Sequence, residues 1–254
     1  MNVACAPSSS SARSRSRLAA VVLTTLAVAS LAVGAVGCSS SNKDPGLAAN
    51  TGTQAAENNP YGVAYPTQNL GTQKRLGNTP GSVMTNYHFV GYAHHEPGSV
   101  VPTGGELQNV SLADFYDPEM RKFKVIHISV AAVWCGPCNE ETDETVPVAE
   151  ELLAKGIVFV QALSDGPVDG RGATKKDLDG WILKHKSNFT ELLDPDLKNF
   201  GKFFNAAAVP WNANIDARTM EILSAGVGAP QKGVKGDTEQ WLTWVESNPP
   251  SYQQ

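Results

Sequence analysis

The chain has 254 residues, of which 41% are hydrophobic and 18% are charged, and its formal net charge at pH 7 is -5. This length allows one ordinary globular core together with long non-globular segments. Nucleic acid binding requires a basic surface, so the acidic balance and the absence of a long Lys/Arg run from the globular part of the sequence argue against a nucleic acid partner.

The beginning of the chain has the pattern of an export signal. Positive charge in SARSRSR precedes the uncharged stretch LAAVVLTTLAVASLAVGAVG, residues 18–37, which is also long enough to span a bilayer as a helix. The sequence AVGC resembles a bacterial lipoprotein cleavage site, although Ala35 stands where a larger aliphatic residue is commoner. This resemblance implies a signal peptide over residues 1–37 and lipid on Cys38. A cleaved soluble protein and an uncleaved anchor are the alternatives.

Residues 38–82 are expected to form a flexible tether. Small and polar residues dominate this stretch, and no apolar period of two or 3.6 residues persists in it. A segment of such low hydrophobicity has no reason to fold, and it would let a folded domain stand away from a membrane surface.

Order is expected to begin near VMTNYHFVGY, residues 83–92, which has strand character. A Gly/Pro-rich turn region and a short helix capped by Ser111 follow. The apolar, β-branched runs at 122–134 and 156–163 are typical of buried central strands, with a helix between them that ends at Gly156.

The last third of the chain is predicted to change from alternating elements to a hairpin. Residues 174–186 form a helix pattern with Leu178, Trp181, Ile182 and His185 on one face, and short elements follow, a strand at 189–194 and a helix at 196–204. Strands at 211–217 and 220–226 are separated by the turn-like DART, and a helix covers 237–247.

The cysteines direct attention to one pair. Cys5 lies in the signal and Cys38 at the lipoprotein-like site, which leaves Cys135 and Cys138, separated by Gly and Pro. In an exported protein such a pair has access to oxidants, so a redox change is chemically available to it.

The motif WCGPC, residues 134–138, resembles the active-site motif of the thioredoxin superfamily. The order of strands and helices around it is similar to that family, and AVP ending at Pro210 matches the family's cis-proline loop. The extension, the export signal and Glu141 are most similar to TlpA-like membrane-tethered thioredoxins. The resemblance implies an α/β thioredoxin fold over residues 83–249, with a central mixed sheet, flanking helices, an N-terminal β extension and a short tail at 250–254.

The resemblance also implies roles for the motif residues. Cys135, at a helix N-terminus where the thiolate is favoured, is the attacking thiol, and Cys138 resolves the mixed disulfide. Gly136 allows the tight turn, Pro137 fits the first helical turn, and Trp134 shields the sulfur pair.

The cis-proline loop is expected to help bind partner chains. Pro210 would set a backbone edge beside the cysteines, offered by Val209, on which partner chains can pair. Trp211 would line the substrate groove as an aromatic contact, or simply cover the edge of the core.

The sequence departs from thioredoxins at the proton relay. Thioredoxins usually carry a buried aspartate six residues before the first cysteine, and Ser129 stands there in this chain. Glu141, one helical turn after Cys138, is the candidate proton acceptor for that thiol, with a solvated acid of the first helical turns as the alternative. The other acids of NEETDET are expected to face solvent.

The resemblance implies an enzyme, a thiol-disulfide oxidoreductase that exchanges disulfides with exported proteins, more often as their reductant, with electrons from a membrane donor. It would be lipid-anchored in a bacterial cell envelope, facing the periplasm, with the Cys135–Cys138 disulfide as its redox group and no other cofactor.

Other interpretations of the cysteine pair remain. A copper-delivery chaperone is the main alternative, because soft thiolates suit Cu(I). A structural disulfide would close too small a loop to constrain the unfolded chain, and a zinc site would need two further ligands, for which the histidines show no matching spacing.

Overall fold

The computed structural model describes residues 58–66, 76–94, 97–205 and 208–250. The predicted signal peptide, Cys38 and the first part of the predicted tether lie outside the described residues, as does most of the predicted tail. Within the described ranges, no helix combines the length and the apolar character that a membrane crossing needs.

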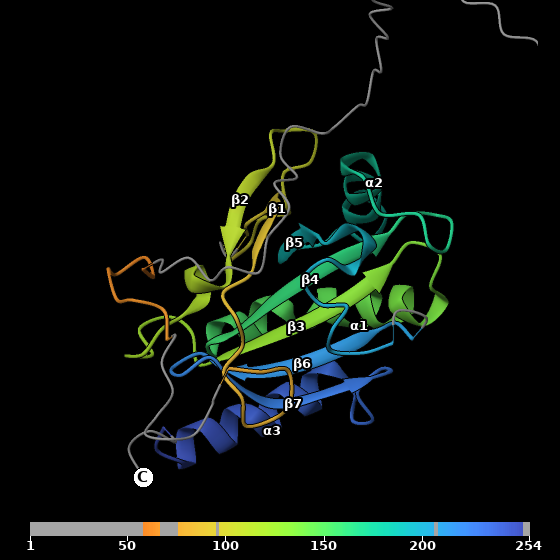
Figure 1. The fold of residues 1–254 in the computed structure, drawn as a ribbon. Coiled ribbons are helices and arrows are strands. Elements are labelled where there is room, and N and C mark those ends of the chain that lie inside the picture. Colours follow the sequence, from red (N-terminus) through yellow and green to blue (C-terminus); the bar gives the residue numbers. More distant parts are fainter. Residues whose placement is uncertain (1–57, 67–75, 95–96, 206–207, 251–254) are drawn as a thin grey trace, which may run out of the picture. The chain divides into compact units, whose positions relative to one another are not determined.

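Seven strands of the described chain form one mixed sheet in the order β2-β1-β5-β4-β3-β6-β7 (Figure 1). The strands are β1 His88–Tyr92, β2 Gln108–Ser111, β3 Val125–Ala132, β4 Ile157–Asp165, β5 Thr190–Leu193, β6 Trp211–Asp216 and β7 Glu221–Val227. The three central strands β5, β4 and β3 are parallel, and the outer strands run antiparallel to their neighbours.

The helices are α1 Gly136–Ala154, α2 Lys175–His185 and α3 Gly233–Ser247, with short 3-10 helices at η1 Leu112–Phe115 and η2 Pro195–Leu197. They lie between these strands in the chain, except for α3, which follows β7. α1 lies between β3 and β4 in the chain and ends before Gly156, whose φ of +94° favours glycine. The sequence predicted this end correctly. It predicted a longer helix at 196–204, of which only the turn η2 forms.

The two faces of the sheet differ in chemistry. α1 and α3 pack against each other and on one face of β3, where Val125 joins a cluster with Leu152 and Val245. The opposite face carries the neighbouring residues of the same strands, among them Ile126 and Ile128, which pack in the largest apolar cluster of the described chain. Side chains of a strand alternate between faces, so this single strand contributes to both cores.

The central part of this arrangement is the thioredoxin fold, as the sequence predicted. β3, α1 and β4 form a parallel unit, and the hairpin β6-β7 followed by α3 extends the sheet beyond β3. β1 and β2 form the predicted N-terminal β extension, which joins the sheet through antiparallel pairing of β1 with β5.

Residues 58–66 correct the predicted extent of the tether. The Asn59 side chain donates a hydrogen bond to the Tyr116 carbonyl oxygen at 2.9 Å, and the Tyr65 hydroxyl donates to the Met84 carbonyl oxygen at 2.8 Å. Tyr65 is only 2% exposed. This segment packs on the domain through single side chains rather than as a strand or helix, so its sequence has no period that would reveal it.

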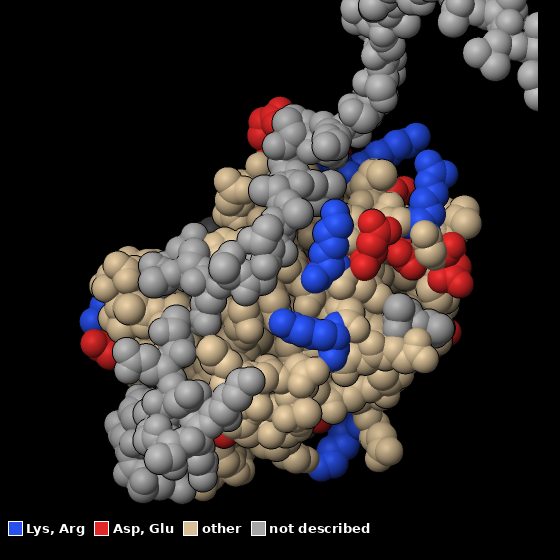
Figure 2. Space-filling view, viewed as in Figure 1, with Lys and Arg blue, Asp and Glu red and all other residues tan. Residues whose placement is uncertain are grey.

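The surface charge agrees with the composition. On the face shown in Figure 2, Lys and Arg side chains lie among Asp and Glu side chains and among large uncharged areas.

Candidate active site at the Cys135–Cys138 pair

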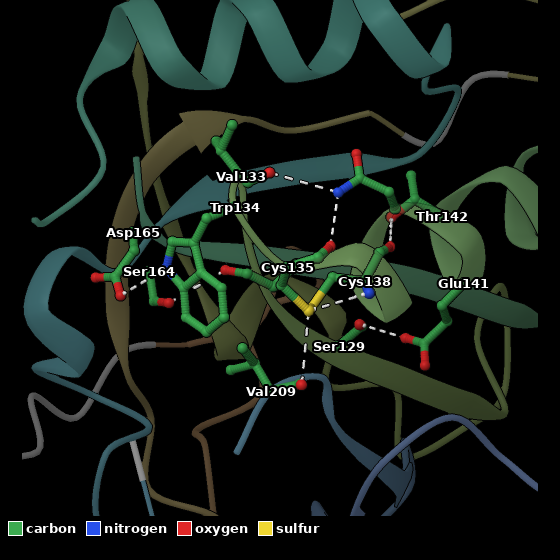
Figure 3. Close-up of a disulfide and its surroundings, with 12 residues drawn as sticks. Ser129, Val133, Trp134, Cys135, Cys138, Glu141, Thr142, Ser164, Asp165 and Val209 are labelled. Atoms are coloured by element: carbon green, nitrogen blue, oxygen red, sulfur yellow. Dashed lines mark hydrogen bonds between the residues drawn. A yellow bond between two sulfur atoms is a disulfide. The ribbon is translucent and has the colours of Figure 1, made fainter. Parts of the chain in front are cut away.

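The two cysteines lie at the junction between β3 and α1 (Figure 3). Cys135 is the N-cap of α1, and its sulfur accepts a hydrogen bond from the Cys138 N-H at 3.1 Å. The two sulfurs form a disulfide. A helix N-terminus presents unpaired N-H groups and positive potential, and both favour a thiolate at such a position.

The two cysteines are buried, but the turn between them is exposed. Cys135 and Cys138 are 2% and 1% exposed, whereas Gly136 and Pro137 between them are exposed. The Gly-Pro turn therefore offers a partner chain exposed surface directly beside the buried sulfur of Cys135.

The predicted cis-proline loop is present beside the disulfide. The Val209–Pro210 peptide bond is cis, and the carbonyl oxygen of Val209 lies 3.5 Å from the sulfur of Cys135. Val209 is half-buried, so part of this segment faces solvent next to the cysteines. The sequence predicted both the isomer and the position of this loop.

Trp134 lies beside the cysteine pair. Its half-buried side chain packs against the apolar cluster that contains both cysteines, and its indole N-H donates to a carboxylate oxygen of Asp165 at 3.3 Å. Figure 3 shows the indole ring and Asp165 together on one side of the cysteine pair. This bond ties the start of the active-site turn to the end of β4.

Trp211 corrects the prediction of a groove contact. This side chain is 1% exposed and stacks on Phe204, with ring centroids 5.5 Å apart and planes 12° apart. It also contacts the rings of Phe200 and Phe203. Trp211 is therefore part of the aromatic core on the face of the sheet opposite α1, and a partner chain cannot reach it in this state. The alternative function given for it, core packing, is the one the structure supports.

Glu141 is a buried acid, not a solvated one. It is 2% exposed, and one oxygen of its carboxylate accepts a hydrogen bond from the Ser129 hydroxyl at 2.7 Å. The other oxygen accepts from the side-chain amide of Asn212 at 2.8 Å. Ser129 of β3 thus holds a carboxylate that comes from α1. Cys138 lies one turn earlier on the same helix and is equally buried.

Several groups act on the proton affinity of this acid. Burial raises the pKa of Glu141 above its ordinary value of 4.5, and this is the largest effect. The hydrogen bond from Ser129, the charge of His127 and the hydrogen bond from Asn212 lower the pKa, while Glu144 raises it slightly. The net effect is a raised pKa, which lies closer to neutral pH than that of an ordinary glutamate.

A second polar cluster, which the sequence did not predict, joins the active-site turn to α2. The side-chain amide of Asn139 donates to the carbonyl oxygen of Cys135 at 2.6 Å. The amide oxygen of Asn139 contacts Lys184 at 2.5 Å and the His185 ring at 3.1 Å, both from α2. The other ring nitrogen of His185 lies 2.6 Å from Asp143. The only signal in the sequence was His185 on the buried face of its helix.

The described residues offer no obvious metal site. No group of three or more His, Cys, Asp and Glu side chains in that part of the chain is arranged to hold a metal ion. Two cysteine sulfurs at the N-terminus of a helix, next to a buried acid, have an arrangement suited to thiol-disulfide exchange.

No protein-family model matches the chain, and no curated protein matches its sequence. Its structure is similar to a thiol:disulfide interchange protein from Bacteroides sp., with 17% identity over 66% of this chain and 92% of that chain and a TM-score of 0.46. It is also similar to the thioredoxin domain of a thiol-disulfide oxidoreductase from Bacteroides vulgatus, with 18% identity, 65% and 99% coverage and a TM-score of 0.46. A third similar structure is the exposed lipoprotein thioredoxin of Streptococcus pneumoniae, with 18% identity, 63% and 99% coverage and a TM-score of 0.41.

Proposed function

We propose that the protein is a thiol-disulfide oxidoreductase that acts through Cys135 and Cys138. The observation that carries this proposal is the position of Cys135, at the N-terminus of α1 and 3.5 Å from the carbonyl oxygen that precedes the cis-proline. A purely structural disulfide between residues three apart would stabilise the fold little and would gain nothing from this position.

The exchange runs in two steps when the protein acts as a reductant. The thiolate of Cys135 attacks one sulfur of a partner disulfide, a mixed disulfide forms, and the partner's other sulfur leaves as a thiolate. Cys138 then loses its proton and attacks the sulfur of Cys135, which forms the disulfide seen here and releases the second partner sulfur as a thiolate. Two electrons pass to the partner, whose two thiolates take up protons. The oxidant direction is the reverse of these steps.

Glu141 is the group that accepts the proton of Cys138. It is buried one helical turn away, and its raised pKa lets it hold a proton at a pH closer to neutral than an ordinary glutamate. We expect Glu141→Gln to slow the second step about a hundredfold, because general bases contribute about this much or more. Glu140→Gln removes an exposed acid of the same helix and is the matched control.

The sequence supports a proposal for the setting of this activity. The signal-like segment, Cys38 and the intervening tether support a TlpA-like protein that is lipid-anchored in a bacterial cell envelope and faces the periplasm. Its partners would be exported proteins with cysteine pairs, and reduction of these partners would require electrons from a membrane donor.

Trapping of the mixed disulfide tests the proposal. Cys138→Ser should form a covalent adduct with a disulfide-containing peptide, because the resolving thiol is missing, and dithiothreitol should release the peptide. Mass spectrometry should place the adduct on Cys135, with Cys5 and Cys38 replaced by serine in all variants. Cys135→Ser is the control and should give no adduct. An adduct on Cys138 only, or none in either variant, would contradict the assignment of the attacking thiol.

A further inference from the structure

A polar network beneath α1 runs from Glu141 of α1 across the sheet to Asp237 of α3. His127 and Ser129 lie two residues apart on β3, and their partners in register on β6 are Asn214 and Asn212. Residues two apart on a strand share a face, so these four side chains form one patch on the face that α1 and α3 cover. Each of them is buried. The network takes no part in the chemistry described above except through Ser129 and Asn212.

The two asparagine amides have fixed orientations. The amide nitrogen of Asn212 donates to Glu141 at 2.8 Å and to the carbonyl oxygen of Gly228 at 3.2 Å. The amide nitrogen of Asn214 donates to Asp237 of α3 at 2.6 Å and to the hydroxyl of Ser224 at 3.0 Å. A carbonyl oxygen and a carboxylate can only accept from these amides, so a reversed amide would lose its hydrogen bonds and place oxygen against oxygen.

The orientations decide which atoms face His127. Its Nε2 lies 3.1 Å from the amide oxygen of Asn212, and its Nδ1 lies 2.9 Å from the amide oxygen of Asn214. A neutral imidazole has one nitrogen that carries a lone pair and no proton, and that nitrogen would face an oxygen lone pair. Both hydrogen bonds form only when both ring nitrogens carry protons, that is, when the ring is an imidazolium.

The surroundings of the ring support a positive charge. Two titratable groups approach it, Glu141 from α1 through Asn212 and Asp237 from α3 through Asn214. The other side chains that line the small cavity beside the ring are uncharged: Phe159 of β4 makes an edge contact with centroids 5.3 Å apart, and Gln161 and Thr145 lie in the same lining. An isolated buried cation is costly, but this one lies between two carboxylates, each one amide away.

We propose that His127 is a buried imidazolium and the positioning residue that keeps Glu141 able to take up and release the proton of Cys138. This inference rests on the proposed function for its role in exchange, whereas the charge of the ring rests on the hydrogen bonds alone. Burial favours the protonated acid, and a nearby cation favours the carboxylate. Without the cation, the pKa of Glu141 would be higher. At any pH below that pKa the acid would already be protonated, so it could not accept the proton of Cys138.

Nitrogen NMR of the full chain labelled with 15N-histidine tests the charge directly. Imidazolium and the two neutral tautomers differ in their ring 15N shifts, and backbone correlation or the spectrum of His127→Gln assigns the signals. We expect both ring nitrogens of His127 to carry protons at neutral pH. One nitrogen with the shift of an unprotonated position would overturn the proposal. This result does not depend on any oxidoreductase activity, so it separates the proposal from the proposed function.

The pH profile of disulfide exchange tests the positioning role. In His127→Gln the acid limb should move to higher pH by about one unit, which is about a tenfold lower rate on that limb. Phe159→Leu is the matched control, because it removes packing against the same ring without a change of charge, and its profile should keep the wild-type midpoint. An unmoved midpoint in His127→Gln, with only a uniform loss of rate, would contradict the role. If the wild type does not exchange disulfides, the proposed function fails and the NMR result still decides the charge.

Discussion

The buried acid Glu191 is expected to make the free energy of unfolding depend on pH. It lies in β5, in register with Gln161 of β4, and it has no exposed surface. Neither oxygen of its carboxylate has a hydrogen-bond partner among the described residues. Burial raises the pKa of Glu191 from 4.5 to about 8, and the nearby Ser187 hydroxyl opposes this shift only in part. The folded protein therefore holds this side chain as a neutral acid at pH 7.

The consequence for stability follows from proton linkage. Between pH 4.5 and about 8 the folded chain keeps a proton on Glu191 that the unfolded chain has released. The free energy of unfolding therefore falls as the pH rises, by about 1.4 kcal/mol per pH unit and ~5 kcal/mol over the whole window. The contribution is fully present below the unfolded pKa and is lost as the pH rises through the folded pKa.

Glu191→Gln removes this contribution while it keeps the shape of the side chain. We expect wild type and variant to be about equally stable at pH 5, and the variant to be more stable by ~4 kcal/mol at pH 8. Urea unfolding followed by tryptophan fluorescence at several pH values measures this difference. Other buried acids, such as Asp194, whose pKa burial raises to about 6, contribute equally to both proteins and cancel. Parallel pH profiles for the two proteins would refute the reasoning.

Two substitutions test how the core is built. Trp211→Ala should lower the free energy of unfolding by about 3–5 kcal/mol, because it empties the centre of the aromatic cluster. Trp244→Ala, at a side chain that is 39% exposed, should cost under about 1 kcal/mol, and equal effects in urea unfolding would contradict the burial of Trp211. Tyr65→Ala should cost about 3 kcal/mol if residues 58–66 pack as described. Tyr61→Ala, at a side chain that is 43% exposed, is its control. If Tyr65→Ala left the thermal midpoint unchanged, residues 58–66 would belong to the flexible tether after all.

The sequence predicted the parts of the fold that depend on local pattern. The continuous apolar runs of β3 and β4 and the glycine that ends α1 lead to the observed elements because each depends on neighbouring residues. The motif around Cys135 and the resemblance to a cis-proline loop at Pro210 located the two halves of the candidate site, which are distant in sequence.

The features that the sequence did not predict depend on contacts between distant segments of the chain. Trp211 follows the cis-proline directly, and only the position of the aromatic rings at 200–204 shows that it points into the core. The partners of His127 come from β6, 85 and 87 residues later, and the register of β3 and β6 cannot be read from either strand alone. A signal was present, because polar residues alternate in both HIS and NAN, which places them on one face of each strand.

The reduction potential of the Cys135–Cys138 pair tests the central claim most directly. The protein is equilibrated with glutathione or dithiothreitol buffers, and the free thiols are alkylated and counted by mass spectrometry, with Cys135→Ser/Cys138→Ser as the control. We predict a reversible two-electron transition between about -270 mV, the value of a reductant such as thioredoxin, and about -120 mV, the value of a strong oxidant. A pair that stays oxidised below about -300 mV, as structural disulfides do, would contradict the account.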